Sequence, residues 1–171
     1  MLVLETLEHA IERGAPIIAE IIAFAETFDA FSMMSISPGG KQIEAMLDDV
    51  LRKAQLSSQD IQYINAHGTG TQVNDREEAD VIRRKFGSSV LVNSTKSLTG
   101  HTIGASGALE AITTALTLHH SIAHPSKNLD DPICDLNFAT SAQTIDTKYA
   151  LTQSFAFGGH NAALVLGRYD D

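Results

Sequence analysis

The chain has 171 residues and a formal net charge of −9, which is the size of one domain. With 43% hydrophobic and 19% charged residues, it has the balance of a globular protein with one sizeable core. It lacks the basic stripe of a nucleic-acid-binding protein, so we expect no nucleic-acid partner. The single cysteine excludes an intrachain disulfide, and no apolar run approaches the roughly 20 residues that span a bilayer. The first residues lack a basic start and a long apolar stretch, so we expect a cytoplasmic protein without a membrane partner.

The first third of the chain predicts two strands and two helices. Residues 1–4 are apolar and predict a strand, and because domains rarely open on a bare core strand we expect a segment before it. Residues 7–13 predict a short helix that Gly14 caps. Residues 17–25 are β-branched and apolar, which predicts a buried strand. Residues 41–55 have helical periodicity, and the apolar residues of the predicted inner face are Ile43, Met46, Leu47, Val50 and Leu51.

The remainder of the chain alternates strands with helices and then clusters strands near its end. Residues 75–86 predict a helix that begins at Asp75 as N-cap and stops at Gly87. Residues 104–120 are mostly small and apolar and predict a helix buried on several sides. Strands are predicted at residues 61–66, 90–93, 137–139, 149–155 and 162–166. This order predicts a mixed α/β sheet with helices on its faces.

Three polar loops follow three of the predicted strands. They read NAHGTGT at residues 65–71, STKSLTGH at 94–101 and FAFGGHN at 155–161. Taken singly, they have plain readings as a structural loop histidine, a solvated lysine and a tight turn. In open α/β sheets ligands bind beyond the carboxyl ends of strands, so three such loops together predict a binding site there.

His101 lies just before the predicted helix at residues 104–120. The positive end of a helix disfavours protonation of a nearby imidazole, so we expect this ring to be neutral. A neutral imidazole can donate one N–H group to a developing oxyanion. The paired glycines at 158 and 159 allow a ligand close to the backbone of the third loop.

The motifs HGTGT, TKSLTGH and FAFGGHNAAL, in this order, resemble those of the β-ketoacyl synthase family. The surrounding text VLETLEHAIERGA and STKSLTGHTIGASGALEA resembles it too, so the similarity covers about residues 1–168. The resemblance implies a thiolase-like α/β half-domain, a mixed sheet of about five strands with helices on both faces. It implies that residues 1–171 are the family's C-terminal domain, with roughly 1–14 as the tail of the N-terminal half.

The resemblance also implies a reaction, the decarboxylative condensation used in fatty-acid or polyketide synthesis. An acyl group sits on a cysteine, and malonyl carried by acyl carrier protein loses CO2 and attacks it. By resemblance, His67 and His101 donate hydrogen bonds to the malonyl thioester oxygen, an oxyanion-hole role. Lys96 supports the site electrostatically and pairs with an acid, for which Glu78 is the match.

Three further residues take roles by resemblance. Phe157 is the gating phenylalanine, and its backbone N–H contributes to an oxyanion hole for the acyl group. Thr69 and Thr71 line the channel for the phosphopantetheine arm of acyl carrier protein. The resemblance implies no metal and no cofactor besides that substrate arm. The expected partners are acyl carrier protein, the missing N-terminal half and, in the intact enzyme, a second copy in a homodimer.

The sequence departs from the family pattern at two points. The nucleophilic cysteine belongs to the N-terminal half, and Cys134, in DDPICDLNF, has no catalytic motif beside it. We therefore interpret Cys134 as a structural thiol and expect the isolated chain to be inactive. The glycine turn reads GGHN where Thr-Asn is frequent in the family, a change from which we expect no functional effect.

Several other interpretations compete with a piece of a condensing enzyme. A natural non-catalytic partner subunit of a condensing heterodimer is disfavoured because His67, Lys96 and His101 are all present. A thiolase or chalcone-synthase relative is disfavoured by the two histidine motifs. A dinucleotide-binding domain is disfavoured because the glycines at 68 and 70 lack the third glycine of that fingerprint. Without its other half, we expect the chain to self-associate through the apolar helix at residues 104–123.

Overall fold

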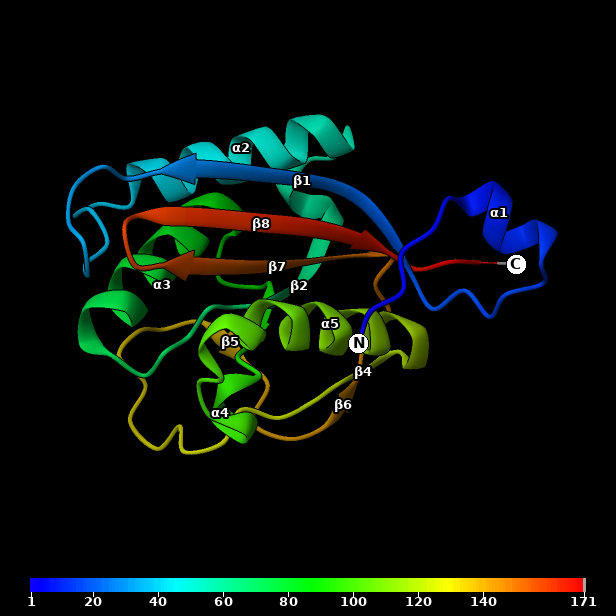
Figure 1. Cartoon of the computed structure of the whole chain (residues 1–171). Helices are drawn as coiled ribbons and strands as arrows, with labels where there is room; N and C mark the ends of the chain where they lie inside the picture. Colours follow the sequence, from blue (N-terminus) through cyan, green and yellow to red (C-terminus); the bar gives the residue numbers. More distant parts are fainter. Residues whose placement is uncertain (171) are drawn as a thin grey trace.

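A six-stranded mixed sheet forms the centre of the chain in the computed structural model, which describes residues 1–170 (Figure 1). The strands lie in the order β1 (Glu20–Phe28), β8 (His160–Gly167), β7 (Tyr149–Ala156), β2 (Ile61–Asn65), β3 (Leu91–Asn93) and β5 (Asn137–Phe138). The first three strands pair antiparallel, and β7, β2, β3 and β5 pair parallel. The parallel strands bring the ends of β2 and β3 to one edge, where two of the polar loops begin.

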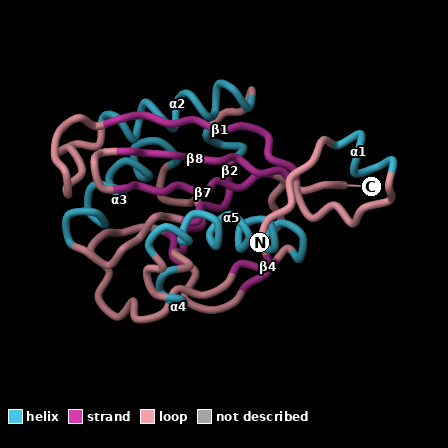
Figure 2. The backbone as a smooth tube through the Cα atoms, viewed as in Figure 1, coloured by secondary structure: helices cyan, strands magenta, loops and turns pink. Residues whose placement is uncertain are grey.

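Helices cover both faces of this sheet, as predicted. The helices and short 3₁₀ turns are α1 (Leu7–Glu12), α2 (Lys41–Ala54), η1 (Ser58–Asp60), α3 (Gln72–Phe86), α4 (Lys96–Thr99), η2 (Ile103–Ala105) and α5 (Ser106–His120). Side chains of α2 and α3 join one hydrophobic core, and α5 joins the core on the opposite face. A separate two-stranded sheet, β4 (Ile122–Ala123) with β6 (Gln143–Thr144), was not predicted. Figure 2 shows how much of the remaining chain is loop.

The periodic face predicted for residues 41–55 is the inner face of α2. Its five apolar residues are all buried, and they pack against residues of β1, β2, β7 and β8 in one core. Removing these side chains from water is the main stabilising contribution of this helix, because burial of one aliphatic side chain contributes about 1.5–3 kcal/mol.

The face of α5 that contacts the sheet is more polar than its composition suggested. The residues buried along this helix are Ser106, Glu110, Ala111, Thr114, Thr117 and Leu118. Leu116 on the same helix is exposed. The helix is therefore buried along one face rather than on several sides, and its buried face carries a carboxylate toward the sheet.

Two strand predictions near the N-terminus were wrong in part. Residues 1–4 form no strand and are exposed, because no neighbouring strand pairs with them. The strand predicted at residues 17–25 is β1, which lies at the sheet edge and alternates between buried Ala23 and Ala25 and exposed Phe24 and Phe28. Only one face of an edge strand meets the α2 core, so the strand is half-buried.

The helix predicted from residue 75 begins earlier, at Gln72, with Thr71 in the N-cap position. Asp75 does not cap the helix, because its Oδ1 accepts hydrogen bonds from the Gly70 N–H and the Asn74 amide instead. The predicted strands near residues 90–93, 137–139, 149–155 and 162–166 correspond to β3, β5, β7 and β8 within a few residues. Among residues 1–170, no helix has both the length and the apolar composition needed to cross a membrane.

The α2 core provides a stability prediction. Leu47 is fully buried in this core, so Leu47→Ala should lower the free energy of unfolding by about 2–5 kcal/mol through lost burial and a cavity. Leu116→Ala, at an exposed position of α5, should cost about 0.5 kcal/mol or less. Urea unfolding followed by circular dichroism measures both, and equal losses would contradict the packing described for α2.

Candidate active site

The His67 ring lies just beyond the carboxyl end of β2 and is buried. Its Nδ1 atom is 3.2 Å from the Lys96 ammonium. The ring also packs edge-on against Phe155 and His101, with centroids 5.3 and 5.8 Å away. The three polar loops therefore meet in space, as the motif order predicted.

Gly68 allows the backbone to turn directly after His67. Its φ is +44°, and a Cβ atom at this position would lie 2.6 Å from the Ser94 Cβ. The Ser94 hydroxyl donates to the Gly68 carbonyl at 3.0 Å. Only glycine permits this close approach of the first and second loops.

Lys96 connects the second loop to the first. It is the first residue of α4, after β3, and is 8% exposed. Its ammonium donates to the His67 carbonyl oxygen at 2.6 Å and forms an ion pair with the Glu110 carboxylate of α5. The reading of this residue as a solvated surface lysine is therefore excluded, since a buried ammonium is stable only when paired.

Each histidine has a fixed donor beside its Nδ1 atom. An ammonium group can only donate hydrogen bonds, so Nδ1 of His67 accepts from Lys96. Nδ1 of His101 accepts from the Ile103 backbone N–H at 3.1 Å. In the neutral form of each ring, these contacts therefore place the proton on Nε2.

Burial, with the positive charge of Lys96 and the neighbouring His101, lowers the pKa of His67 to about 3. Desolvation disfavours the charged form of the ring, and the ammonium repels a second positive charge. His67 is therefore a neutral hydrogen-bond donor over the whole physiological range.

The pairing of Glu78 with Lys96 was a wrong prediction. Glu78 lies on α3, buried, and its carboxylate accepts from the backbone N–H groups of His67 and Gly68 at 2.7 and 2.8 Å. It also accepts from the side-chain amides of Asn74 at 3.1 Å and Gln153 at 2.7 Å. The difference arises because α3 and α5 cover opposite faces of the sheet, and α5 carries its own acid to the lysine.

Burial raises the pKa of Glu78, and the hydrogen bonds from Gly68, Gln153 and His67 act in the opposite direction by stabilising the charged form. The carboxylate joins three parts of the chain, since its donors come from the first loop, from α3 and from β7. Its role in this structure is to hold the backbone of the His67 loop.

Sequence reasoning missed Glu110 and Gln153. Glu110 is the sole Asp, Glu, Lys or Arg between residues 104 and 120, and a lone charge in an apolar helix requires a partner. That signal could have identified it. Gln153 had no comparable signal, because its role depends on the position of β7 next to β2.

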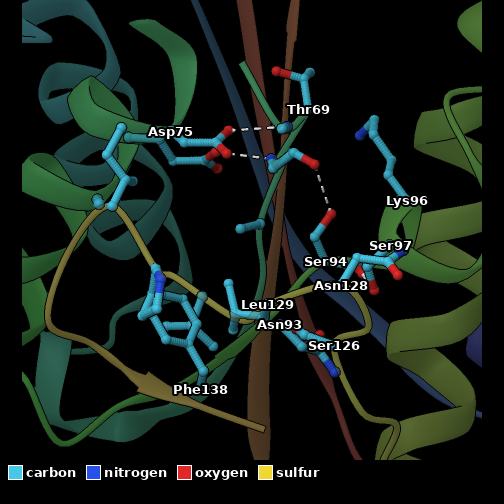
Figure 3. Close-up of a pocket in the computed structure, with 18 of the residues that line it drawn as sticks. Thr69, Asp75, Asn93, Ser94, Lys96, Ser97, Ser126, Asn128, Leu129 and Phe138 are labelled. Carbon is cyan, nitrogen blue, oxygen red and sulfur yellow. Dashed lines mark hydrogen bonds between the residues drawn. The ribbon is translucent and has the colours of Figure 1, made fainter. Parts of the chain in front are cut away.

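Thr69, Thr71 and Lys96 line one cavity, of about 790 Å³, between the first loop, α3 and the loop that follows β4 (Figure 3). The hydroxyls of the two threonines are 3.0 Å apart. His101 reaches the same cavity, and Phe138 and Leu129 contribute apolar surface to it. The cavity therefore joins Lys96 and His101 to the predicted arm-binding threonines.

Phe157 lies in the β7–β8 turn and is 73% exposed. The Gly158 N–H donates to the Met33 carbonyl, and the Asp29 N–H donates to the Gly159 carbonyl, each at 2.8 Å. Hydrogen bonds to residues 29–33 thus hold the turn, while the Phe157 side chain is exposed to solvent.

Cys134 also lines the cavity, but its chemistry does not suit a nucleophile. Burial and the nearby negative charges, first that of Asp75, raise the pKa of its thiol. A raised pKa keeps the sulfur protonated and unreactive at neutral pH, which agrees with the structural reading of this residue.

Comparison with known proteins assigns the class. Residues 18–130 match the family described as "Beta-ketoacyl synthase, C-terminal domain". The chain is 41% identical over 180 residues to 3-oxoacyl-[acyl-carrier-protein] synthase 2 of Staphylococcus aureus (strain COL), covering 99% of this chain and 42% of that protein.

Solved structures agree in fold. A β-ketoacyl synthase from Burkholderia phymatum STM815 matches with a TM-score of 0.92 and 37% identity, over 97% of this chain and 41% of that one. A type II polyketide ketosynthase, solved in complex with its acyl-carrier protein, matches with a TM-score of 0.91 and 32% identity over 97% and 42%. The chain belongs to the β-ketoacyl synthase family and has the thiolase-like fold, and it spans less than half the length of these relatives.

The neutral His67 predicts a pH dependence of stability. Its folded pKa of about 3 lies below the ordinary 6.5, so this contribution to stability is complete above 6.5 and is lost as pH falls toward 3. His67→Gln should flatten the acid decline by up to about 1.4 kcal/mol per pH unit in this window. Urea unfolding at a series of pH values measures the slope. His119→Gln, at an exposed position, is the control, and an unchanged slope in His67→Gln would contradict the assignment.

The ion pair predicts a pattern of coupled stability losses. Glu110→Gln leaves the Lys96 ammonium buried without a countercharge and should cost about 3–5 kcal/mol. Adding Lys96→Met should recover much of that loss. Lys96→Met and Glu78→Gln should instead be closer to additive. Double-mutant cycles from urea unfolding measure these coupling energies. Stronger coupling of Lys96 to Glu78 than to Glu110 would support the pairing predicted from the sequence and contradict the ion pair of the structure.

Proposed function

We propose that this chain supplies the decarboxylating part of a 3-oxoacyl-[acyl carrier protein] synthase active site, in fatty-acid or polyketide synthesis. The observation that carries the proposal is the pair of imidazoles, His67 and His101, whose Nδ1 atoms each lie beside a hydrogen-bond donor and whose ring centroids are 5.8 Å apart. Two such N–H donors can converge on one oxygen atom.

The chemistry of decarboxylation fits these donors. When a malonyl thioester loses CO2, the electron pair of the broken C–C bond moves onto the thioester oxygen as an enolate. Hydrogen bonds from Nε2 of His67 and His101 stabilise that charge, and each preorganised donor typically contributes about 2.7–4 kcal/mol. Lys96 keeps His67 neutral and correctly oriented, so that the ring donates a hydrogen bond and does not protonate the enolate carbon.

The second half of the reaction needs a nucleophile that Cys134 does not supply. In the proposed enzyme an acyl thioester on a cysteine outside this chain is attacked by the enolate carbon, and the cysteine thiolate leaves. Phe157 gates this position, and its backbone N–H contributes to the hole for the acyl oxygen. Thr69 and Thr71 bind the phosphopantetheine arm, and their place on the cavity wall supports this role.

The exposed apolar side chains support an N-terminal half as partner. Phe24 and Phe28 on β1, Ile103 in η2 and Phe157 are each at least half exposed, and together they offer apolar surface of the kind that partners cover. We assign residues 1–14 to the connection with that half, because α1 lies apart from the sheet in Figure 1. We also propose that acyl carrier protein binds to the intact enzyme. That enzyme is proposed to be a homodimer located in the cytoplasm.

The test is release of CO2 from malonyl-acyl carrier protein. The chain is assayed alone, mixed with a cysteine-bearing N-terminal part of the Staphylococcus aureus relative, and fused to that part as one polypeptide. The chain alone should be inactive because the half of the active site that carries the cysteine is absent. The fused protein should be active, and His67→Ala or His101→Ala should each lower kcat by about 10²-fold or more.

His119→Ala, at the exposed end of α5, is the matched control and should retain full activity. A folded fusion that binds acyl carrier protein but is inactive would contradict the decarboxylating role and favour a non-catalytic partner subunit. Activity that survives both histidine substitutions would contradict the roles assigned to the two rings.

A further inference from the structure

His124 belongs to none of the three motifs, yet hydrogen bonds connect it to the ends of β3 and, through Thr95, of β2. His124 lies in the loop between β4 and β5 and is half-buried. The Asn93 side-chain amide donates to the His124 carbonyl at 2.7 Å. The ring Nε2 is 3.3 Å from the Thr95 hydroxyl, and Nδ1 is 3.0 Å from the Pro125 carbonyl oxygen.

These contacts determine the direction of the hydrogen bonds. A carbonyl oxygen only accepts, so Nδ1 of the neutral His124 ring carries the proton. Its Nε2 is then a lone pair, and the Thr95 hydroxyl must donate to it. This is the tautomer opposite to that of His67 and His101.

The Thr95 hydroxyl also contacts Asn65, whose side-chain N–H can only donate to it. With its proton committed to His124, the hydroxyl oxygen accepts from the Asn65 side-chain amide at 2.8 Å. The Asn65 side-chain oxygen in return lies 3.3 Å from the Thr95 backbone N–H, and its amide also reaches the Glu110 carbonyl at 3.2 Å. Asn65 and Thr95 are both buried, so water does not compete for these groups and each wrong orientation leaves an unpaired polar atom.

The Asn65–Thr95 pair lies directly beside the candidate catalytic residues. Asn65 ends β2 two residues before His67, Thr95 immediately precedes Lys96, and Glu110 is the partner of that lysine. We propose that His124 is a positioning residue for the Lys96–His67 pair, because its ring sets the hydrogen-bond direction that holds the ends of β2 and β3 together. The catalytic meaning of this role rests on the proposed function, but the contacts themselves do not.

The test uses the full chain without substrate, labelled with ¹⁵N at histidine and observed by NMR. In the unaltered chain, His124 should show the Nδ1–H tautomer, and His67 should show Nε2–H with Nδ1 accepting from Lys96. In His124→Ala the Thr95 hydroxyl loses its acceptor. The Lys96 ammonium should then withdraw from His67, and the titration midpoint of the His67 ring should rise by about one pH unit.

Four variants separate positioning from general destabilisation. His124→Gln offers Thr95 a side-chain oxygen as acceptor and should restore the His67 signals. Thr95→Val should reproduce the effect of His124→Ala, and the two together should shift His67 no further than either alone. His120→Ala, at an exposed position four residues away, should change nothing at His67.

Other results would overturn the proposal. These are an Nε2–H tautomer at His124, an unchanged His67 titration in both His124→Ala and Thr95→Val, or additive shifts in the double variant. If His124→Ala does not fold, Thr95→Val and the tautomer of the unaltered chain still decide the question. The NMR experiment contains no substrate, so a failed decarboxylation assay would not contradict the positioning role of His124. Likewise, a failed NMR test would not contradict the proposed decarboxylation.

Discussion

A buried ammonium is the constraint on which the site depends. Lys96 is removed from water at the end of β3, and such a charge is stable only with a countercharge and good hydrogen-bond acceptors. Glu110 supplies the charge from α5, and the His67 carbonyl supplies an acceptor from the first loop. Satisfying this one group therefore brings a helix, two strand ends and the His67 loop together, and it also keeps the His67 ring neutral.

A second buried acid holds the same loop from the other face of the sheet. Glu78 accepts from the backbone N–H groups of His67 and Gly68, while Glu110 acts on the His67 side chain through Lys96. The first carboxylate determines where the backbone turns, and the second determines which ring nitrogen is free to donate. Such a division explains why two acids in apolar surroundings are compatible with a stable fold, since every donor around them is used.

The exposed side of the site is as informative as its buried side. His101 and Phe157 are exposed, in contrast to His67 and Lys96, and apolar side chains on β1 and η2 are exposed as well. The chain spans less than half the length of its relatives, which agrees with the proposal that the nucleophile lies outside it. Contacts within the chain hold both rings, since Lys96 lies beside Nδ1 of His67 and the Ile103 N–H beside Nδ1 of His101.

Periodicity and motif order determined much from the sequence alone. The spacing of apolar residues predicted α2 and its inner face, the polar loops at strand ends predicted where His67, Lys96 and His101 meet, and the three motifs indicated the family. These signals are local, or they follow from the common edge at which parallel strands end. Only the tertiary structure decided that β1 is an edge strand, that Glu110 and not Glu78 pairs with Lys96, and that His124 joins the network. The physical reason is that the partner of a buried charge depends on which face of the sheet each helix covers, and no spacing along the chain records that choice.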